Sequence, residues 1–426
     1  MQKLSGILIF ISFITTLYSY FIDNTYLVAS SLILWLSAIL LFSTLKNKNV
    51  VLILILLSLI LFFGSYINGF TIDLNKVFSI NQYLIILLVG VGFLRLIIDP
   101  KEDSLSHRSK GKSGFLKTYL SLHLFGSMIN ISALLIVADR LYKKAGKLSN
   151  LQVILLTRAF SSDAFWSPFF VAFGVAITFA PNLEMQYVTT SGLVLAFFSF
   201  IFTYFEIKSR DDLDSFEGYP LDLQSLILPF SLAFFVLLVH YFYKDIKIIV
   251  LISFLAFVLS LIILPIKDGL KKTYSKYKKH INEDLPNMKS EISLFLAAGM
   301  FGVSVSSILY GIGFTLPFEY FDYKIASAVL LLFIVLSFIG IHPIITISIF
   351  GHMLVDFNQS LVAMTFLMAW GITVSTSPFS GQTITLHARY KVDIKELVKS
   401  NIFFISKIYI VCICLLYIAS EYLDLK

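Results

Sequence analysis

The sequence predicts an all-α polytopic membrane protein with about 11 transmembrane helices plus two re-entrant hairpins in an inverted repeat. Three observations lead to this prediction: apolar runs follow one another along the chain, Lys and Arg fall unevenly between them, and one pattern of small and polar residues occurs twice. The 426 residues are 58% hydrophobic and 14% charged, with a mean hydropathy of +0.86. A soluble domain cannot bury that much apolar surface, so lipid is expected to surround most of the chain.

Thirteen apolar runs have about the 17–25 residues needed to cross a bilayer. Because lipid offers the backbone no hydrogen-bond partners, each run is expected to be helical. The first run lacks a small-residue cleavage site and leads straight into the next, which favours a retained helix over a signal peptide. The runs are 5–21, 26–45, 50–68, 82–98, 117–139, 153–181, 187–206, 225–243, 248–266, 291–313, 325–350, 361–386 and 401–419.

The positions of Lys and Arg separate two topologies. If all thirteen runs cross and the N-terminus is inside, 16 of these residues lie on each side. If 117–139 and 325–350 turn back instead, 27 lie inside and 5 outside. Basic residues are enriched in cytoplasmic loops, so the second topology is favoured although the acidic loop 207–224 then also lies inside. We therefore expect a multi-pass protein of the cytoplasmic (inner) membrane with a cytoplasmic N-terminus.

The remaining composition argues against other classes of partner. The net charge of +7 comes from loop residues that set membrane orientation, so it does not indicate nucleic-acid binding. Cys412 and Cys414 are two apart on one helix and point to different faces, so neither a mutual disulfide nor a metal motif is expected. No cofactor is expected, and membrane lipid is the expected partner.

The chain also looks doubled, because each hairpin is followed by a run interrupted by small and polar residues. The first half reads LFGSMINISALLIVADR and then TRAFSSDAFWSPFFVAFG; the second reads SFIGIHPIITISIFGHM and then AWGITVSTSPFSGQTITLH. Gly126 to Ser161 and Gly340 to Ser375 both span 35 residues. Two copies entering from opposite sides form an inverted repeat, in which a substrate site near the midplane lies between the breaks.

Broken helices have a physical use and also a simpler interpretation. Their half-helix ends offer N–H groups to anions and carbonyls to cations, and unwound backbone is tolerated in lipid only against protein or water. However, hydroxyls in membrane helices also bond back to their own carbonyls, and Pro343 alone can kink an ordinary span. Both interpretations stay open. The hydroxyl residues concerned are Ser161, Ser162, Ser167, Thr373, Ser375, Thr376, Ser377, Ser380 and Thr383.

Asp163 is the most informative single residue. It lies ten positions into the run that starts at 153, about 15 Å deep at a rise of 1.5 Å per residue. An ionisable group at that depth is costly and marks a functional site, where it can ligate Na⁺, carry a proton or pair with a cation. The structural alternative is a pair with Arg158 or with a lysine elsewhere, although Arg158 is expected to snorkel to the inner face.

Two polar residues occupy the hairpins at similar places. Asn130 offers both a donor and an acceptor, and His342 can titrate near neutral pH or simply pack. Trp166 and Trp370 flank the two breaks, where they wall a cavity or pack in the core.

In layout, nearly the whole chain resembles the ion transporter superfamily, and within it the divalent anion:sodium symporters. These proteins have eleven spans, an inner and an outer hairpin, and a broken helix after each. Their hairpin tips carry a Ser-Asn-Thr signature, and their broken helices a Thr-Pro-rich turn. The corresponding residues are Ser127, Asn130 and Ser132 in GSMINIS, His342, Pro343 and Thr346 in the outer hairpin, Ser161 to Pro168 in the first break, and Thr376, Ser377 and Pro378 in STSPFSGQT.

The resemblance implies a secondary transporter, not an enzyme, that moves a small organic anion coupled to Na⁺ or H⁺ by an elevator motion. It also implies a homodimer, with a moving domain made of 117–206 and 325–419. The basic segment 267–290 and its mate at 99–117 are then interfacial helices that lie on anionic lipid. The implied divisions are scaffold 1–116, first-repeat transport elements 117–206, scaffold 207–324 and second-repeat transport elements 325–426.

The expected site residues follow from the hairpins and breaks. A Na⁺/H⁺ antiporter of the same superfamily is the first alternative, because Asp163 suits that chemistry. An integral-membrane enzyme acting on a lipid-linked substrate is the second, although the sequence contains no HExxH, Asp-rich or GxxxxGK[ST] motif for catalysis or nucleotide binding. Expected cation ligands are Asp163, Asn130, Ser377 and Gly381. Expected substrate-binding residues are Ser127, Asn130, Ser132, Ser161, Ser162, His342, Thr346, Ser375, Thr376, Ser377 and Gln382.

Overall fold

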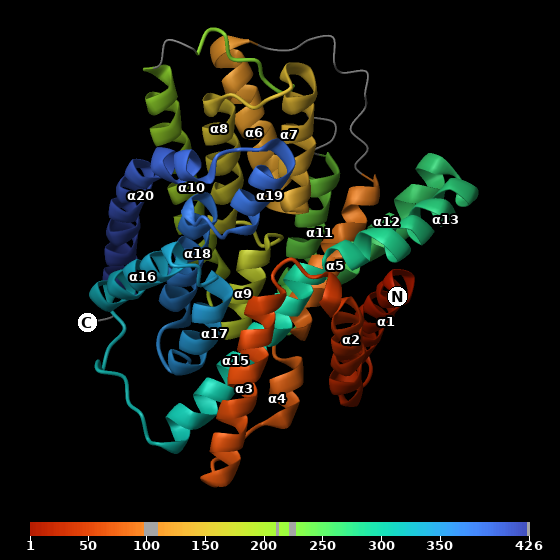
Figure 1. The fold of residues 1–426 in the computed structure, drawn as a ribbon, viewed down its shortest axis with the longest axis vertical. Helices are drawn as coiled ribbons and strands as arrows, with labels where there is room; N and C mark the ends of the chain where they lie inside the picture. Colours follow the sequence, from red (N-terminus) through yellow and green to blue (C-terminus); the bar gives the residue numbers. More distant parts are fainter. Residues whose placement is uncertain (98–109, 210–212, 221–226, 424–426) are drawn as a thin grey trace. The chain divides into compact units, whose positions relative to one another are not determined.

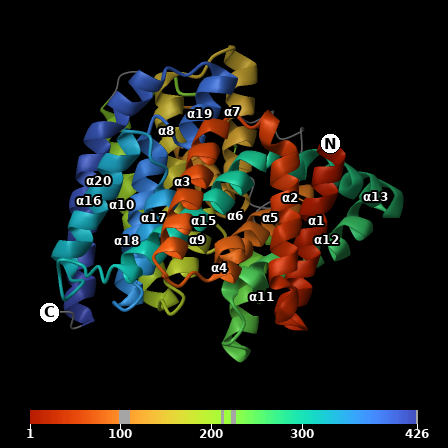
Figure 2. The ribbon, with the colours of Figure 1, turned by 60° about the horizontal axis from the view of Figure 1, so that its bottom comes forward.

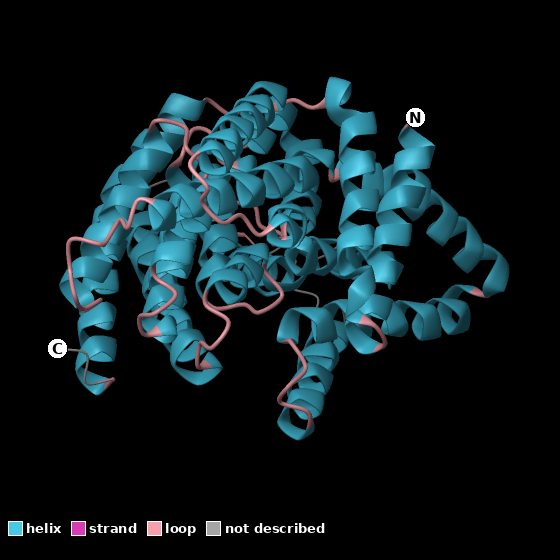
Figure 3. Cartoon of the chain, turned by 90° about the horizontal axis from the view of Figure 1, so that it is seen from below, coloured by secondary structure: helices cyan, strands magenta, loops and turns pink. Residues whose placement is uncertain are grey.

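The computed structural model describes residues 1–97, 110–209, 213–220 and 227–423, and its secondary structure over these ranges is helical (Figure 3). The one extended pairing within them is an isolated bridge between Lys110 and Glu217. Among the described residues, nine helices are long and apolar enough to cross a membrane. The predicted all-helical membrane class is therefore confirmed.

The chain divides into two compact units. Unit 1 comprises 1–98, 232–317 and 344–354, and unit 2 comprises 99–231, 318–343 and 355–426. Each unit therefore takes segments from both halves of the chain. Most of the interfacial segment expected at 99–117 falls at 98–109, outside the described residues.

The helices of unit 1 pack in pairs. Helices α1 and α2 lie side by side in both views (Figures 1 and 2), and α3 packs on α15 and α5 on α12. A Cβ at Gly90 would lie 2.7 Å from the Cα of Ser253, so glycine permits the close approach of α5 to α12. The bounds are α1 (Gln2–Phe21), α2 (Leu27–Leu41), α3 (Lys48–Ile67), α4 (Leu74–Ser79), α5 (Gln82–Ile97), α12 (Ile248–Asp268), α13 (Leu270–Lys279), α14 (Leu285–Asn287) and α15 (Lys289–Gly311).

Unit 2 contains most of the hairpin and broken-helix residues. Four predicted apolar runs each hold two α-helices here, because helices end and restart inside them. Two helices straddle the division between the units: α11 (Ile227–Phe242) and α17 (Pro343–Met353). The others are α6 (Gly111–Ile129), α7 (Ile131–Ala145), α8 (Asn150–Ser161), the 3-10 turn η4 (Ser162–Phe165), α9 (Val171–Phe179), α10 (Met185–Lys208), α16 (Tyr323–Phe338), α18 (Gln359–Thr376), α19 (Gly381–Tyr390) and α20 (Ile394–Tyr422).

The chain reverses direction at Asn130, between α6 and α7. The hydroxyl of Thr118 on α6 accepts a hydrogen bond from the Tyr219 N–H at 2.6 Å. The guanidinium of Arg140 on α7 lies 5.2 Å from the ring centroid of the same tyrosine. Residues well before and well after Asn130 thus meet one partner, so α6 and α7 run alongside each other.

The series α6–α10 and the series α16–α20 correspond in register. Their short helices α9 and α19 begin at Val171 and Gly381, which are 210 positions apart. The positive-φ residues Asn130 (φ 52°) and Gly340 (φ 100°) are separated by the same number. Glycine adopts positive φ freely, whereas Asn130, with ψ −137°, lies outside the left-handed helical region that asparagine tolerates.

Candidate functional site

Both broken helices contain the same Ser-Pro-Phe turn. In the first, the Ser167 hydroxyl donates to the carbonyl of Ser127, and it accepts from the Phe169 N–H at 3.2 Å. In the second, the Ser377 hydroxyl donates to the carbonyl of Ser337 at 2.7 Å, and it accepts from the Phe379 N–H at 3.2 Å. Each serine lies 40 residues after its carbonyl partner. The same two bonds therefore tie each break to the end of a helix that lies 40 residues earlier, α6 for the first break and α16 for the second.

These bonds correct the register inferred from spacing. The sequence pattern matched Gly126 with Gly340, whereas the bonded serines match Ser127 with Ser337 and hence Asn130 with Gly340. The difference is four residues. Because a helix turns once in 3.6 residues, a shift of four preserves the polar pattern and cannot be detected from it.

Asn130 closes the first break. Its Oδ1 accepts from the Val171 N–H and its Nδ2 donates to the Phe169 carbonyl, both at 3.2 Å. The carboxamide thus caps the first turn of α9 and holds the unwound residue before it. Asn130 was expected to bind both substrate and cation, and the structure directs its amide oxygen and nitrogen to the protein's own backbone.

Asp163 lies fully buried in η4, next to His123 of α6. Nδ1 of His123 is 2.7 Å from Oδ1 of Asp163. Neither carboxylate oxygen makes a hydrogen bond of good geometry with a described residue. A Cβ at Gly126 would stand 2.1 Å from Oδ2, so only glycine at this position leaves room for the carboxylate.

The neighbours of His123 define its protonation. The Trp166 indole N–H, which can only donate, points to Nε2 at 3.2 Å, so Nε2 is unprotonated. The Ser162 hydroxyl donates to the Ala159 carbonyl at 2.8 Å, which leaves its oxygen to accept from Nδ1 at 2.9 Å. These bonds favour a neutral His123 with its proton on Nδ1, a form that does not offset a charge on Asp163.

An ionised Asp163 would therefore lack an opposing charge, and this determines what the cluster can bind. A buried carboxylate without an opposing charge is strongly disfavoured. A proton or a small cation on Asp163 removes the imbalance, and protonation of His123 at Nε2 removes it at the expense of the Trp166 bond. The cluster of His123, Ser162, Asp163 and Trp166 can thus hold one positive charge.

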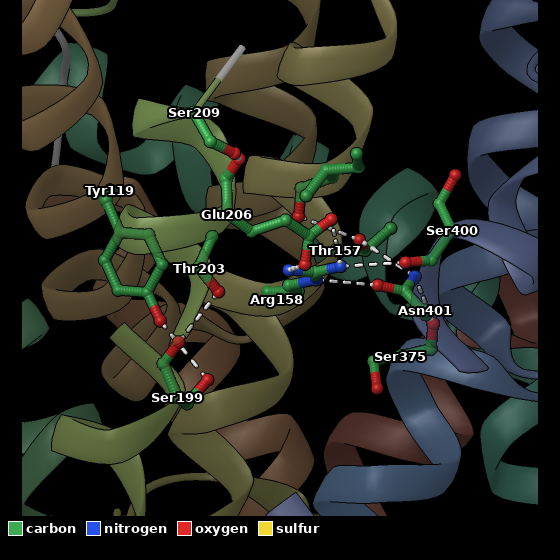
Figure 4. Close-up of polar contacts among 11 residues, drawn as sticks. Tyr119, Thr157, Arg158, Ser199, Thr203, Glu206, Ser209, Ser375, Ser400 and Asn401 are labelled. Carbon is green, nitrogen blue, oxygen red and sulfur yellow. Dashed lines mark hydrogen bonds and ion pairs between the residues drawn. The ribbon is translucent and has the colours of Figure 1, made fainter. Parts of the chain in front are cut away.

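Arg158 does not pair with Asp163, and it does not snorkel to a surface as expected. It is fully buried, and its two terminal nitrogens reach the Glu206 carboxylate at 2.8 and 3.3 Å (Figure 4). Its Nε donates to Asn401 Oδ1 and its Nη2 to the Ser400 carbonyl, both at 2.8 Å. The reason is geometric: carboxylate, amide and carbonyl acceptors from α10 and α20 satisfy the guanidinium inside the protein.

The same network joins the two halves of unit 2. Asn401 of α20 also donates to the carbonyl of Ser375 at 2.9 Å, at the end of α18 (Figure 4). Arg158 of α8 is thus linked to the second broken helix through one amide. On the other side of the first break, the ring of Phe165 packs against Gly371 of α18, where a Cβ would be 2.3 Å away. The structure therefore places the first break directly against the helix that leads to the second.

Most of the hydroxyls predicted to bind ligand donate to their own helices. Ser127 bonds to Leu124 O at 2.9 Å, and Ser161 to Arg158 O at 3.2 Å. Ser375 and Thr376 both bond to Ile372 O at 2.8 Å. These donors follow the alternative interpretation, in which membrane hydroxyls bond back to the preceding turn. Their oxygens keep lone pairs that can accept.

The other predicted residues lie in several places. His342 meets Trp370 edge to face, with ring centroids 5.3 Å apart, and Ser132 lies half-buried in the first turn of α7. Gly381 and Gln382 begin α19, where Gly381 is exposed and Gln382 is buried. Thr346 belongs to unit 1, unlike the rest.

Sequence reasoning missed His123, Glu206 and Asn401. One signal was present for His123, because it is an ionisable residue inside the apolar run 117–139, the criterion that identified Asp163. Glu206 and Asn401 stand at the ends of runs, where polar residues are ordinary. Nothing in the pattern distinguished them.

Comparisons with known proteins add no relative. No protein-family model matches this chain, and no curated protein matches it.

Proposed function

We propose that this protein is a secondary active transporter that moves a small organic anion across the cytoplasmic membrane, coupled to Na⁺ or H⁺, by elevator-type alternating access. The observation that carries the proposal is Asp163, a fully buried carboxyl in a broken helix with Nδ1 of His123 2.7 Å from one of its oxygens. An ionisable group inside a membrane helix is costly and marks an ion pathway or a coupling site. Coupling requires a group that binds and releases one positive charge, and a buried carboxyl beside a histidine is suited to that role.

The proposed architecture is an inverted repeat with two re-entrant hairpins. The pair α6 and α7 enters from the inside, and the pair α16 and α17 enters from the outside. The matched Ser167 and Ser377 turns support the repeat, and the distribution of Lys and Arg supports the opposite orientations. The moving body expected from the sequence, 117–206 and 325–419, lies in unit 2 except for 344–354, which the structure groups with unit 1. We propose that it moves as one body within each subunit of a homodimer.

A Na⁺/H⁺ antiporter is the second candidate, and a specific observation favours it. His123 and Asp163 together can exchange a proton for a cation at one place, because the carboxylate oxygens have no other hydrogen-bond partner among the described residues. Such an exchange needs no organic substrate.

The two candidates are separated with purified full-length protein in vesicles that enclose a pH-sensitive dye. An antiporter moves protons when Na⁺ is added outside, and Asp163→Asn abolishes this flux. Asp356→Asn is the matched control, because Asp356 is an exposed carboxylate in the same unit. A symporter shows no proton flux with Na⁺ alone.

For the symporter, a thermal-shift screen against carboxylates and sulfate, at graded Na⁺ and pH, identifies the substrate class. A ligand of the folded state raises the melting temperature by mass action. Uptake of that ligand should follow a Na⁺ or pH gradient in the wild type and not in Asp163→Asn. Absence of both gradient-driven uptake and Na⁺-driven proton flux would show that the protein is not a cation-coupled transporter.

A further inference from the structure

We propose that the substrate is held at the second break, Ser377–Gln382, and that the group held there is a carboxamide. That this ligand is a transported substrate rests on the proposed function, whereas its binding at the break does not. The two breaks are built alike except for one side chain, Asn130 at the first and Gly340 at the second.

The first break is filled by the protein. The Asn130 carboxamide accepts from the Val171 N–H, at the first position of α9, and donates to the Phe169 carbonyl. One planar group thus satisfies a donor and an acceptor of the interrupted helix. The first N–H groups of a helix have no intrahelical partner, so a group of this kind stabilises the break.

The second break has the same turn without that side chain. The residue matched to Asn130 is Gly340, and the residue matched to Val171 is Gly381. Ser380 caps α19 at the Thr383 N–H (3.1 Å), two positions further into the helix. A Cβ on Gly381 would meet no atom within 4 Å and Gly381 is exposed, so no other side chain packs against this position.

Gln382 supplies the second and independent observation. Its side chain is only 2% exposed, and neither Nε2 nor Oε1 has a hydrogen-bond partner among the described residues. A buried amide that bonds to nothing is costly, so a native site of this kind is completed by a ligand or water. The residue is adjacent to Gly381 in the first turn of α19.

The pair of unsatisfied atoms identifies the chemical class. A carboxamide ligand donates to Oε1 and accepts from Nε2, and so satisfies both ends of Gln382. A carboxylate accepts from Nε2 but leaves Oε1 facing a negative charge. The first break gives the precedent, because there the protein uses a carboxamide rather than a carboxylate. We therefore expect an organic acid that also carries a primary carboxamide.

The test measures equilibrium binding to the full-length protein in detergent, by calorimetry, with two matched pairs of probes. These are succinamate against succinate, and propionamide against propionate. The wild type should bind each carboxamide about tenfold or more tightly than its carboxylate, as expected for one buried hydrogen bond gained and one repulsion avoided. Equal binding, tighter carboxylate binding, or no carboxamide binding at millimolar concentration overturns the proposal.

Two variants test the mechanism separately. Gly340→Asn should fill the site as Asn130 fills the first one and abolish the carboxamide preference. Gly340→Ala carries the same positive-φ strain and the same approach to the Phe379 ring (3.3 Å) without the amide, and should keep the preference. The carboxamide site is ruled out if both variants lose the preference for carboxamides equally. It is also ruled out if Gly340→Asn folds and keeps that preference.

Gln382→Met avoids backbone strain altogether and should bind amide and acid equally. An unchanged preference in this variant also overturns the proposal. The readout requires no membrane gradient, so it is distinct from the transport assay. If the protein prefers carboxamides but shows no coupled flux, only the proposed transport function is refuted. If it shows coupled flux but no preference for carboxamides, only the carboxamide site is refuted.

Discussion

At the scale of single residues, a glycine determines where the buried carboxylate of unit 2 can lie. Gly126 on α6 faces Asp163 so closely that any side chain would occupy the position of Oδ2. The carboxylate therefore sits against the backbone of α6 while His123 of the same helix approaches Oδ1. One helix thus supplies both the space and the nearest donor.

Gly126→Ala is predicted to displace the Asp163 carboxylate. Overpacking of this kind costs about 1–3 kcal/mol, and gradient-driven flux should be lost with it. Flux per reconstituted protein and the melting temperature are the measurements. Gly64→Ala is the control, because a Cβ there makes only an ordinary contact of 3.6 Å with Ile308. Normal coupled flux in Gly126→Ala would show that the position of Asp163 is not critical.

Arg158 is predicted to be structural. Arg158→Ala removes the hydrogen bonds of a fully buried guanidinium to the Glu206 carboxylate, Asn401 Oδ1 and the Ser400 carbonyl, and a hydrogen bond to a charged group contributes about 1.5–3 kcal/mol. Arg158→Met with Glu206→Leu should lose less, since apolar side chains of similar volume replace both members of the ion pair. Unfolding in detergent measures both variants. Equal losses in the single and double variants would contradict this account.

At the scale of elements, the positions of the breaks could be predicted from the sequence. Which side chain bonds to the interrupted backbone at each break could not. Pro168 and Pro378 lack the N–H that continues the backbone ladder, and the small and polar residues around them mark the breaks, whereas Pro265 lies inside α12 without ending it. Whether a break is closed by a residue 40 positions away depends on which residue ends the neighbouring helix. A carboxamide at Asn130 and none at Gly340 is a difference of one side chain, and its consequence appears only in three dimensions.

The basic helix α13 remains a predicted lipid-binding element. Its exposed lysines are held outward by a buried Thr273 and by the pairing of Lys276 with Asp268 at 2.7 Å. Each lysine near an anionic surface contributes about 1 kcal/mol. Replacement of four exposed lysines of α13 with Gln should abolish retention of anionic lipid, measured by native mass spectrometry at low salt. The four are Lys271, Lys272, Lys278 and Lys279.

Their specificity has a direct control. Lys46→Gln with Lys48→Gln removes basic charge elsewhere in unit 1 and should leave lipid retention unchanged. Retention of anionic lipid by the fourfold variant would exclude α13 as the binding element.

At the scale of the whole molecule, the topology determines whether the repeat is inverted. The predicted arrangement puts Lys147 inside and Asp356 outside, although an all-crossing chain puts Lys147 outside. Both positions are exposed in the structure, so a probe can reach them. The two native cysteines are free, one buried and one exposed, as predicted for neighbours on different faces of one helix.

Single cysteines introduced by Lys147→Cys and Asp356→Cys, with Cys412→Ser and Cys414→Ser, test this topology. An impermeant maleimide should react with the second site in intact cells and with the first only after permeabilisation. Reaction at position 147 in intact cells would rule out the inward hairpin, and with it the inverted repeat. Reaction at both sites after permeabilisation is the control for accessibility.

The sequence by itself determined the helical class, the membrane as solvent and the places where helices break. These properties follow from local composition, because apolar length, proline and glycine act over a few neighbouring residues. Tertiary structure decided the partner of Asp163, the pairing of Arg158 with Glu206 and the four-residue correction to the repeat. Those depend on contacts across 40 or more positions, such as Arg158 with Glu206 or Asn401, and a helical pattern that repeats every turn does not encode which turn meets which.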